Sequence, residues 1–487
     1  MDLPLADHPD AARPQGRVLR LTAQAAAAIE AFFVRHRDHL RWLHIAMFVA
    51  FVVIMVVPLI LPDPPATATP LTHFTTLANY VLWGLWFPLV FLSVIFAGRV
   101  WCGTLCPMGA ASEWVNGFGL QRAIPGWLRW EGTPLVSFVV TTILGQTLGV
   151  RDHPEGAAEV FGATMVAALV IGFLYGRKKR VWCRHMCPIG RVLGLYSRLG
   201  AVQFMPAGAA AGRERALAGG AGQRSGERGI CPTMIDLARK TESRHCITCF
   251  RCVMPEARGG MRMRLRRPGA EIEQIRDFRA NPAEVWFLFL DTGVALGGFL
   301  WLVLPLFQDL RQRFAEWIID HDLLGLTEPG PAWLMSVHPA RAEVFSWLDF
   351  LMIVAFMSGC MVLLTVILTA LTAVSAAVAG RVGADGGFRQ RFTELGYQYA
   401  PVALVSLIIG LGTRLFMPIA DTPLGMPGVH GVEGTVFVLG VLWSIVLGER
   451  ILARQGVAAA RRWLPLLPGV AGSAIVGLLW WPAIFGA

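Results

Sequence analysis

The sequence predicts a mainly α-helical, polytopic membrane protein with about nine transmembrane helices and a small cytoplasmic insertion. Two observations support this fold class. Hydrophobic residues make up 55% of the 487 residues and charged residues only 16%, a balance that argues against a soluble protein. Long apolar runs also recur along the chain. About 20 mostly apolar residues let a helix cross the bilayer core while it satisfies its own backbone.

The apolar runs define nine predicted spans, of which the third and fourth are short. They lie near residues 43–61, 78–97, 134–149, 160–176, 284–306, 346–375, 398–418, 432–449 and 463–484. Nearly all of the 43 lysine and arginine residues fall in loops on one side of these spans. The positive-inside rule therefore predicts a cytoplasmic N-terminus and an external C-terminus. The net charge of +10 thus reflects topology and does not indicate a nucleic-acid partner.

The spans and the polar segments between them divide the chain into five predicted parts. These are a cytoplasmic N-terminal arm (1–42) with a helix at the membrane surface, two transmembrane hairpins (43–199), a flexible linker (200–229), a cysteine-rich unit with a basic exit (230–283) and a five-helix membrane region (284–487). The linker is assigned from its Gly-, Ala- and Arg-rich composition.

The most specific motif lies in the cysteine-rich unit and reads CPTMIDLARKTESRHCITCFRC (231–252). A reducing cytoplasm disfavours structural disulfides, so clustered cysteines there indicate metal or redox chemistry. The C-x2-C-x2-C spacing lets one tight loop supply three thiolates to an iron–sulfur cluster, and a cysteine followed by proline can supply the fourth. We therefore predict a ferredoxin-like unit with one [4Fe–4S] cluster. Its ligands are Cys231, Cys246, Cys249 and Cys252.

A second cluster within this unit is not expected. Its ligands would fall at four positions that hold no cysteine, namely Ala221, Arg224, Glu227 and Glu256. A structural zinc site is the alternative for the motif, because four thiolates also suit tetrahedral zinc. Zinc sites usually combine a C-x2-C pair with a distant pair, so the spacing favours an iron–sulfur cluster.

Each predicted hairpin ends in one copy of a repeated motif, and the copies read RVWCGTLCPMG (99–109) and RVWCRHMCPIG (180–190). Cysteines four residues apart lie on one face of a helix, and proline favours the first turn of a following helix. The repeat could bring four thiols together at the membrane surface, those of Cys102, Cys106, Cys183 and Cys187. Such a site could hold a second cluster, a copper or zinc ion, or two reversible disulfides.

Outside the cysteine motifs, Asp291 is the strongest candidate for a functional residue. It lies two turns inside a predicted span, and intramembrane carboxylates often handle protons or quinones. Helix packing with Ser or Thr partners is the alternative. Scattered histidines on the predicted outer face could form a copper or quinone-head site, although loop histidines usually do not; they are His73, His153, His338 and His430. Cys360, alone within a span, is expected to be a packing residue.

Basic residues cluster around the cysteine-rich unit, as in RKKR (177–180) and RMRLRR (262–267). Some are expected to contact anionic lipid. The others would present a positive face beside the cluster. Such a face steers an acidic partner, which predicts a cytoplasmic electron carrier such as a ferredoxin or flavodoxin, or a reductase.

With these motifs, the chain resembles the NapH/NosR/CcoG group of membrane-bound polyferredoxins over roughly residues 40–260. That group carries paired C-x3-C-P motifs at cytoplasmic helix ends, followed by a ferredoxin-like domain. The resemblance implies electron transfer at the inner face of the bacterial cytoplasmic membrane, between quinol or soluble carriers and a respiratory or copper-handling system. Members commonly hold two clusters in the soluble domain, whereas this chain keeps ligands for one. The five C-terminal spans have no counterpart in the small members.

The sequence thus predicts a redox subunit that passes electrons between a cytoplasmic carrier and the quinone pool or a membrane partner. No residue pattern indicates a stand-alone catalytic site. One alternative is metal handling, in which the four thiols of the repeat bind copper for cuproenzyme assembly. Another is a membrane anchor for a soluble reductase.

Overall fold

The computed structural model describes residues 17–65, 67–177, 179–206, 231–237, 240–253, 261–341 and 343–485. Within them the chain is mainly helical, and eight helices are long and apolar enough to cross a membrane. These helices are His39–Ile60, Phe74–Ala97, Pro154–Leu174, Pro282–Val303, Trp347–Arg381, Phe388–Ile419, Gly425–Arg454 and Trp463–Phe485. The prediction of a mainly helical chain with many candidate spans is confirmed.

The third predicted span, near 134–149, forms a helix that is too short to cross. α7 (Thr133–Thr147) has 15 residues, and at 1.5 Å per residue it is about 22 Å long, against about 30 Å for the hydrocarbon core. The other short prediction, 160–176, becomes the longer helix α8 (Pro154–Leu174), because a proline in its first turn lets it begin earlier.

Two of the eight candidate spans are composite. Phe74–Ala97 contains α3 (Phe74–Tyr80), a π-helical turn (Val81–Trp86) and α4 (Phe87–Ala97), and Phe388–Ile419 contains α17 (Phe388–Gly396) and α18 (Ala400–Phe416). The uninterrupted spans are α2 (His39–Ile60), α8, α14 (Pro282–Val303), α16 (Trp347–Arg381), α19 (Gly425–Arg454) and α20 (Trp463–Phe485). The shorter elements are α1 (Arg17–Arg35), α5 (Pro107–Asn116), α6 (Gly126–Arg129), α9 (Val181–His185), α10 (Pro188–Tyr196), β1 (Val202–Pro206), β2 (Met261–Leu265), α13 (Ala270–Glu273), α15 (Pro305–Asp320), β3 (Val337–His338) and β4 (Glu343–Val344).

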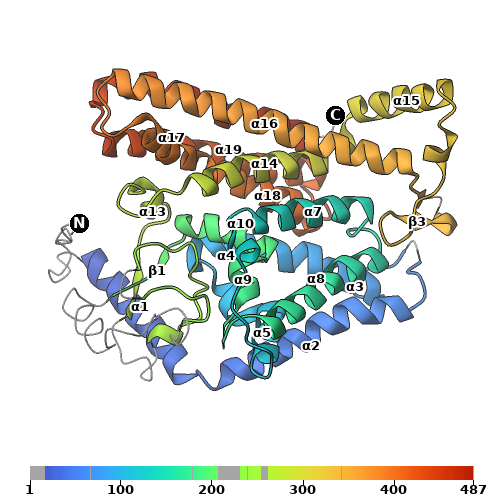
Figure 1. Ribbon diagram of the computed structural model, residues 1–487, viewed down its shortest axis with the longest axis horizontal. Helices are drawn as coiled ribbons and strands as arrows, with labels where there is room; N and C mark the ends of the chain where they lie inside the picture. Colours follow the sequence, from blue (N-terminus) through green and yellow to red (C-terminus); the bar gives the residue numbers. More distant parts are fainter. Residues whose placement is uncertain are drawn as a thin grey trace.

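The helices of the two halves of the chain lie side by side (Figure 1). α14 and α16–α20 form one side, α2–α8 form the other, and α7, α10 and α14 contact one another between them. The strands β1 and β2, together with α1, lie at one end of the helices. α15 and β3 lie at the opposite end (Figure 1).

Small residues bring α14 and α16 close together. A Cβ on Gly293 would lie 2.7 Å from the Cα of Met361, and a Cβ on Gly297 would lie 2.9 Å from the Cα of Met357. Glycines at such contacts let membrane helices pack backbone against backbone. Cys360 lies in this contact, with its Cβ 3.0 Å from the Cβ position of Gly297, as expected for a packing residue.

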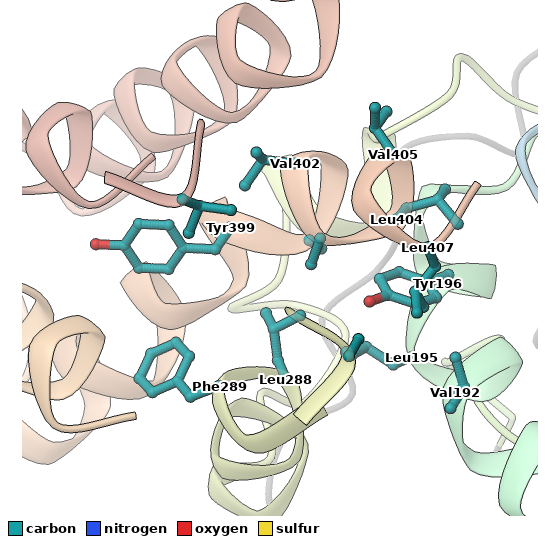
Figure 2. Close-up of a cluster of buried hydrophobic side chains, with 14 of the residues drawn as sticks. Val192, Leu195, Tyr196, Leu288, Phe289, Tyr399, Val402, Leu404, Val405 and Leu407 are labelled. Carbon is teal, nitrogen blue, oxygen red and sulfur yellow. The ribbon is translucent and has the colours of Figure 1, made fainter. Parts of the chain in front are cut away.

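A buried apolar cluster joins α10 to the C-terminal helices (Figure 2). Side chains from α10 face side chains from α14 and α18 across it; those labelled are Val192, Leu195, Tyr196, Leu288, Phe289, Tyr399, Val402, Leu404, Val405 and Leu407. Because α10 begins at the second copy of the repeated motif, this cluster attaches that motif to the C-terminal half of the chain.

The strand pair corrects two assignments made from the sequence. β1 occupies part of the segment assigned to the linker (200–229) and pairs antiparallel with β2, with Phe204 opposite Met263; residues 207–230 lie outside the described residues. α1, expected at the membrane surface, packs on these strands instead. Its Ala26 is buried and its Glu30 carboxylate accepts a hydrogen bond from the Met263 amide at 2.9 Å.

A buried ion network holds the cysteine-rich unit on the helices. The guanidinium of Arg198, which is fully buried, donates to Glu284 of α14 at 2.9 Å and to Glu271 at 2.8 Å. It also donates to Glu242 at 3.0 Å, just before the C-x2-C-x2-C motif. Removing one member of such a network leaves uncompensated buried charge, which is strongly destabilising. The network therefore fixes where the cysteine loop lies.

Candidate metal centres

The four cysteines of the ferredoxin-like motif surround one small pocket. The pocket is lined by Cys231, Cys246, Cys249 and Cys252 together with apolar side chains that include Phe204, Ile235, Leu237, Ile247 and Phe250. Four thiols that converge in an apolar pocket are the donor set required by a [4Fe–4S] cluster. The residues present therefore fit the predicted group, and we call this pocket the loop site.

The backbone of the loop site is unusual on both sides of Cys249. Thr248 has a φ of 51° and Phe250 a φ of 58°, in the left-handed region that residues with a side chain rarely adopt. Burial raises the pKa of the Cys249 thiol to about 11. A free thiol in this place would stay protonated, and a coordinated metal would be needed to remove its proton. Strained backbone of this kind is typical of ligand sites.

The repeated motif forms the same structure twice. In each copy the amide of the second cysteine donates to the tryptophan carbonyl five residues earlier, Cys106 to Trp101 at 2.8 Å and Cys187 to Trp182 at 2.9 Å. The second cysteine then caps the next helix. Its Sγ accepts from the glycine amide of C-P-x-G at 3.4 Å in the first copy and at 3.2 Å in the second. Both sulfurs thus lie at positive helix N-termini, which favour thiolate.

The two copies meet, and their four thiols lie close enough to affect one another. Burial, together with the neighbouring thiols of Cys106 and Cys102, raises the pKa of Cys187 to about 12. Burial also raises the pKa of Cys183, and the three neighbouring thiols of Cys106, Cys187 and Cys102 add to the rise. The predicted convergence of Cys102, Cys106, Cys183 and Cys187 is therefore present, and we call it the repeat site.

The glycine of C-P-x-G in each copy of the motif packs against residues of the other copy, which leaves little room for a side chain. A Cβ on Gly109 would lie 3.2 Å from the Sγ of Cys183 and 3.2 Å from Nη1 of Arg180. A Cβ on Gly190 would lie 3.2 Å from Nη2 of Arg99. The arginine of one copy therefore covers the glycine of the other, in both directions.

Both arginines open the repeated RVWC; no local pattern indicated a role for Arg99, and Arg180 was expected on the surface as part of the basic RKKR segment. Both are almost fully buried. Arg180 donates to the carbonyl of Cys102 at 2.7 Å and to Glu113 at 2.7 Å. Arg99 donates to the carbonyl of Arg244 at 2.9 Å, and its Nη2 lies 3.9 Å from the Sγ of Cys102. Two buried cations beside the thiols favour a negatively charged occupant.

The loop site and the repeat site are in direct contact. Gly103, between the two cysteines of the first copy, packs on the backbone of the C-x2-C loop. A Cβ there would lie 2.1 Å from the carbonyl oxygen of Ile247 and 2.9 Å from the Cα of Cys249. His44 of α2 supports this contact, with its Nε2 3.2 Å from the carbonyl oxygen of Gly103. No sequence pattern indicated that the two motifs touch.

The remaining candidates lie away from both sites. Asp291 is fully buried in α14; one carboxylate oxygen accepts from the hydroxyl of Tyr196 at 3.0 Å and the other has no partner. Its partner is thus a tyrosine, and not the Ser or Thr of the helix-packing alternative. His153 and His338 stack at 3.8 Å. Both ring nitrogens of His153 are occupied, one by Glu343 and one by Arg341, each at 2.8 Å.

Comparison with known proteins identifies the group to which these sites belong. The family described as "4Fe-4S binding domain" matches the chain over residues 80–125 and 160–204, and each segment contains one copy of the repeated motif. The regulatory protein NosR of Pseudomonas aeruginosa is 29% identical over 155 residues, which cover 26% of this chain and 21% of NosR. The chain is thus similar to NosR-type membrane 4Fe–4S proteins. The resemblance inferred from the motifs is confirmed.

A second relative of the chain is an uncharacterized protein of Methanocaldococcus jannaschii, 25% identical over 173 residues. The match covers 34% of this chain and 64% of that protein, so the chain spans less than two thirds of either relative. No solved structure matches. The family match supports an iron–sulfur interpretation of the repeated motif, which lies within the matched residues.

The N-terminal helix α1 packs against the loop site. The ring of Phe33 stacks on Phe250 at 3.7 Å and an interplanar angle of 9°. We expect Phe33→Ala to expose the loop site, because buried aromatic surface is replaced by solvent. Iron–sulfur absorbance should then bleach severalfold faster in air. Phe32→Ala, on the exposed side of the same helix, is the control and should bleach at the wild-type rate; equal rates for both variants would contradict this role.

Proposed function

We propose that this chain is a membrane-bound electron-transfer protein. In this proposal electrons pass through the loop site and the repeat site, between a cytoplasmic carrier and the quinone pool or a membrane partner. The observation that carries the proposal is the contact at Gly103, where the backbone beside Cys102 touches the backbone at Cys249. Two redox centres in adjoining loops can pass electrons from one to the other. A protein that only anchors a soluble reductase would not need a second redox centre.

The thiols present determine which groups the two sites would hold. Cys231, Cys246, Cys249 and Cys252 would hold one [4Fe–4S] cluster, and we assign a second to Cys102, Cys106, Cys183 and Cys187, because the 4Fe–4S family matches both copies of the repeat. Such a cluster, when bound, supplies one-electron redox chemistry. The protein contributes apolar walls that exclude water and, at the repeat site, the buried guanidiniums of Arg99 and Arg180, which favour the more negative redox state.

The experiment that tests the proposal uses the full chain in proteoliposomes. We expect reduced flavodoxin, added to the face that carries β2, to bleach the iron–sulfur absorbance, and quinone in the bilayer to restore it. The positive-inside rule supports assigning that face to the cytoplasm, at the inner membrane of a bacterium. Failure of every low-potential donor to reduce the protein would refute the proposal.

The exposed face of β2 is the docking surface we propose for that acidic donor. Met261 and Met263 are buried while Arg262 and Arg264 are exposed on the alternate face. Charge reversal of both arginines to glutamate should lower the association rate with flavodoxin by about tenfold at low salt, because steering by the positive face is lost. Arg389→Glu, exposed on α17, is the control. A rate unchanged in the double variant, measured by stopped flow, would contradict this surface.

A further inference from the structure

A cavity of about 200 Å³ lies along the N-terminal helices, away from the cysteine sites. His44 of α2 contacts the repeat site, whereas Met55 and Pro58 of the same helix line the cavity. Eleven residues of helix separate His44 from Met55, or about 16 Å at 1.5 Å per residue. The cavity therefore lies toward the end of the helices that carries β3 (Figure 1), since its lining residue His153 stacks on His338 of β3.

The cavity has an apolar wall and a polar end. Its apolar lining includes Ile54, Met55, Leu82, Trp83 and Val150, and its polar lining includes Thr75, Asn79, Asp152, His153 and Arg414. The hydroxyl of Thr75 is buried and has no hydrogen-bond partner among the described residues. Arg414 donates to the side chain of Asn79 and lies 3.6 Å from Asp152. Apolar walls with a few convergent polar groups are typical of sites for small amphipathic ligands.

Two departures from regular helix build this cavity. The π-helical turn Val81–Trp86 carries Trp83 into the wall. On the other side, α18 is kinked at Gly412, with φ −105° and ψ 15°, two residues before Arg414. A Cβ on Gly84 would lie 3.5 Å from the Cβ of Arg414, so the turn and the kink meet. π-Helical turns occur most often at functional sites, which favours a ligand site over a packing defect.

Aromatic side chains lie between the cavity and the repeat site. Trp83 lines the cavity and Trp86 lies three residues further along the same π-helical turn. The ring of Trp86 lies 5.5 Å from that of Trp101, which directly precedes Cys102. An aromatic path to a redox centre favours a redox-active ligand over a structural phospholipid.

We propose that this cavity binds the headgroup of a quinone. This proposal rests on the proposed function, since it names the quinone as the membrane-side partner of the repeat site. The ring lies against Trp83, a quinone carbonyl accepts hydrogen bonds from Arg414 and Thr75, and the isoprenoid tail leaves past Ile54 toward the lipid. Asp152 and Asn79 hold the guanidinium of Arg414 in place.

Binding of decylubiquinone to the full chain in phosphatidylcholine nanodiscs tests the site directly. Arg414→Gln should raise the dissociation constant by about tenfold or more, because a hydrogen bond from a charged group is lost. Arg313→Gln, on exposed α15 at the same end of the molecule, should leave it unchanged. In the wild-type protein a photoreactive azidoquinone should label peptides containing residues 75–86 or 150–157.

The outcomes separate this site from the proposed function. Normal binding by a Cys102→Ser/Cys187→Ser variant that has lost electron transfer would support the cavity independently of the thiols. Labelling elsewhere in the wild-type chain, or equal affinity of Arg414→Gln and Arg313→Gln, would overturn the proposal. Displacement of the quinone by phosphatidylglycerol at equal concentration would assign the cavity to phospholipid. That result would also overturn the quinone proposal.

Discussion

Protein purified without oxygen is expected to contain about eight iron atoms and about eight acid-labile sulfides per chain, because two separate sets of four thiols are present. Cys249→Ser and Cys183→Ser should each remove about half of both, since each breaks one set. Iron by mass spectrometry and sulfide by colorimetry measure this directly. The effect is large because a cluster with a missing thiolate is lost whole.

Cys360→Ser provides the matched control. Its thiol lies in the contact between α14 and α16, apart from both sites, so the variant should keep all of its iron. About four irons per chain, lost in Cys249→Ser and unchanged in Cys183→Ser, would contradict a cluster in the repeat site. Copper bound there in place of iron would favour the metal-handling alternative, because four soft thiolates also suit Cu(I). Zinc at both sites would end the electron-transfer interpretation.

The sequence predicted the features that depend on local pattern. An apolar run of about 20 residues has few options other than a spanning helix, so α2, α14, α16 and α20 lie close to their predicted spans, whereas α19 extends beyond its predicted span at both ends. The C-x2-C-x2-C spacing likewise predicted that one loop would gather its thiols, and the doubled motif predicted that the four cysteines of the repeat would meet.

Features that depend on tertiary contact could not be predicted in this way. α1 is amphipathic, and a helix of that kind suits a membrane surface as well as the strands it covers. The five residues of β1 lie next to a Gly-rich segment, and their partner β2 is 55 or more positions further on, so no local pattern indicated a strand. The roles of Arg99 and Arg180 follow from a crossing of two copies that a single sequence does not reveal. The contact between Gly103 and the loop site could not be predicted from a single sequence either.

Gly103→Ala is expected to uncouple the two sites while leaving both assembled. The added Cβ would lie 2.1 Å from the carbonyl oxygen of Ile247, a backbone atom that cannot rotate away, so the two loops must move apart. Overpacking of this kind costs about 1–3 kcal/mol, too little to release eight thiolate ligands. Iron content should therefore stay near the wild-type value. The magnetic interaction between the reduced centres, measured by electron paramagnetic resonance, should weaken.

Gly126→Ala is the control, because a Cβ at that position meets no atom within 4 Å. It should reproduce both the iron content and the spectrum of the wild type. An unchanged interaction in Gly103→Ala, with unchanged thermal stability, would mean that the backbone contact does not set the separation of the centres. Loss of iron from both sites would mean that the contact holds the thiols themselves in place. Only a weakened interaction with full iron identifies Gly103 as the point at which the two centres are brought within reach of each other.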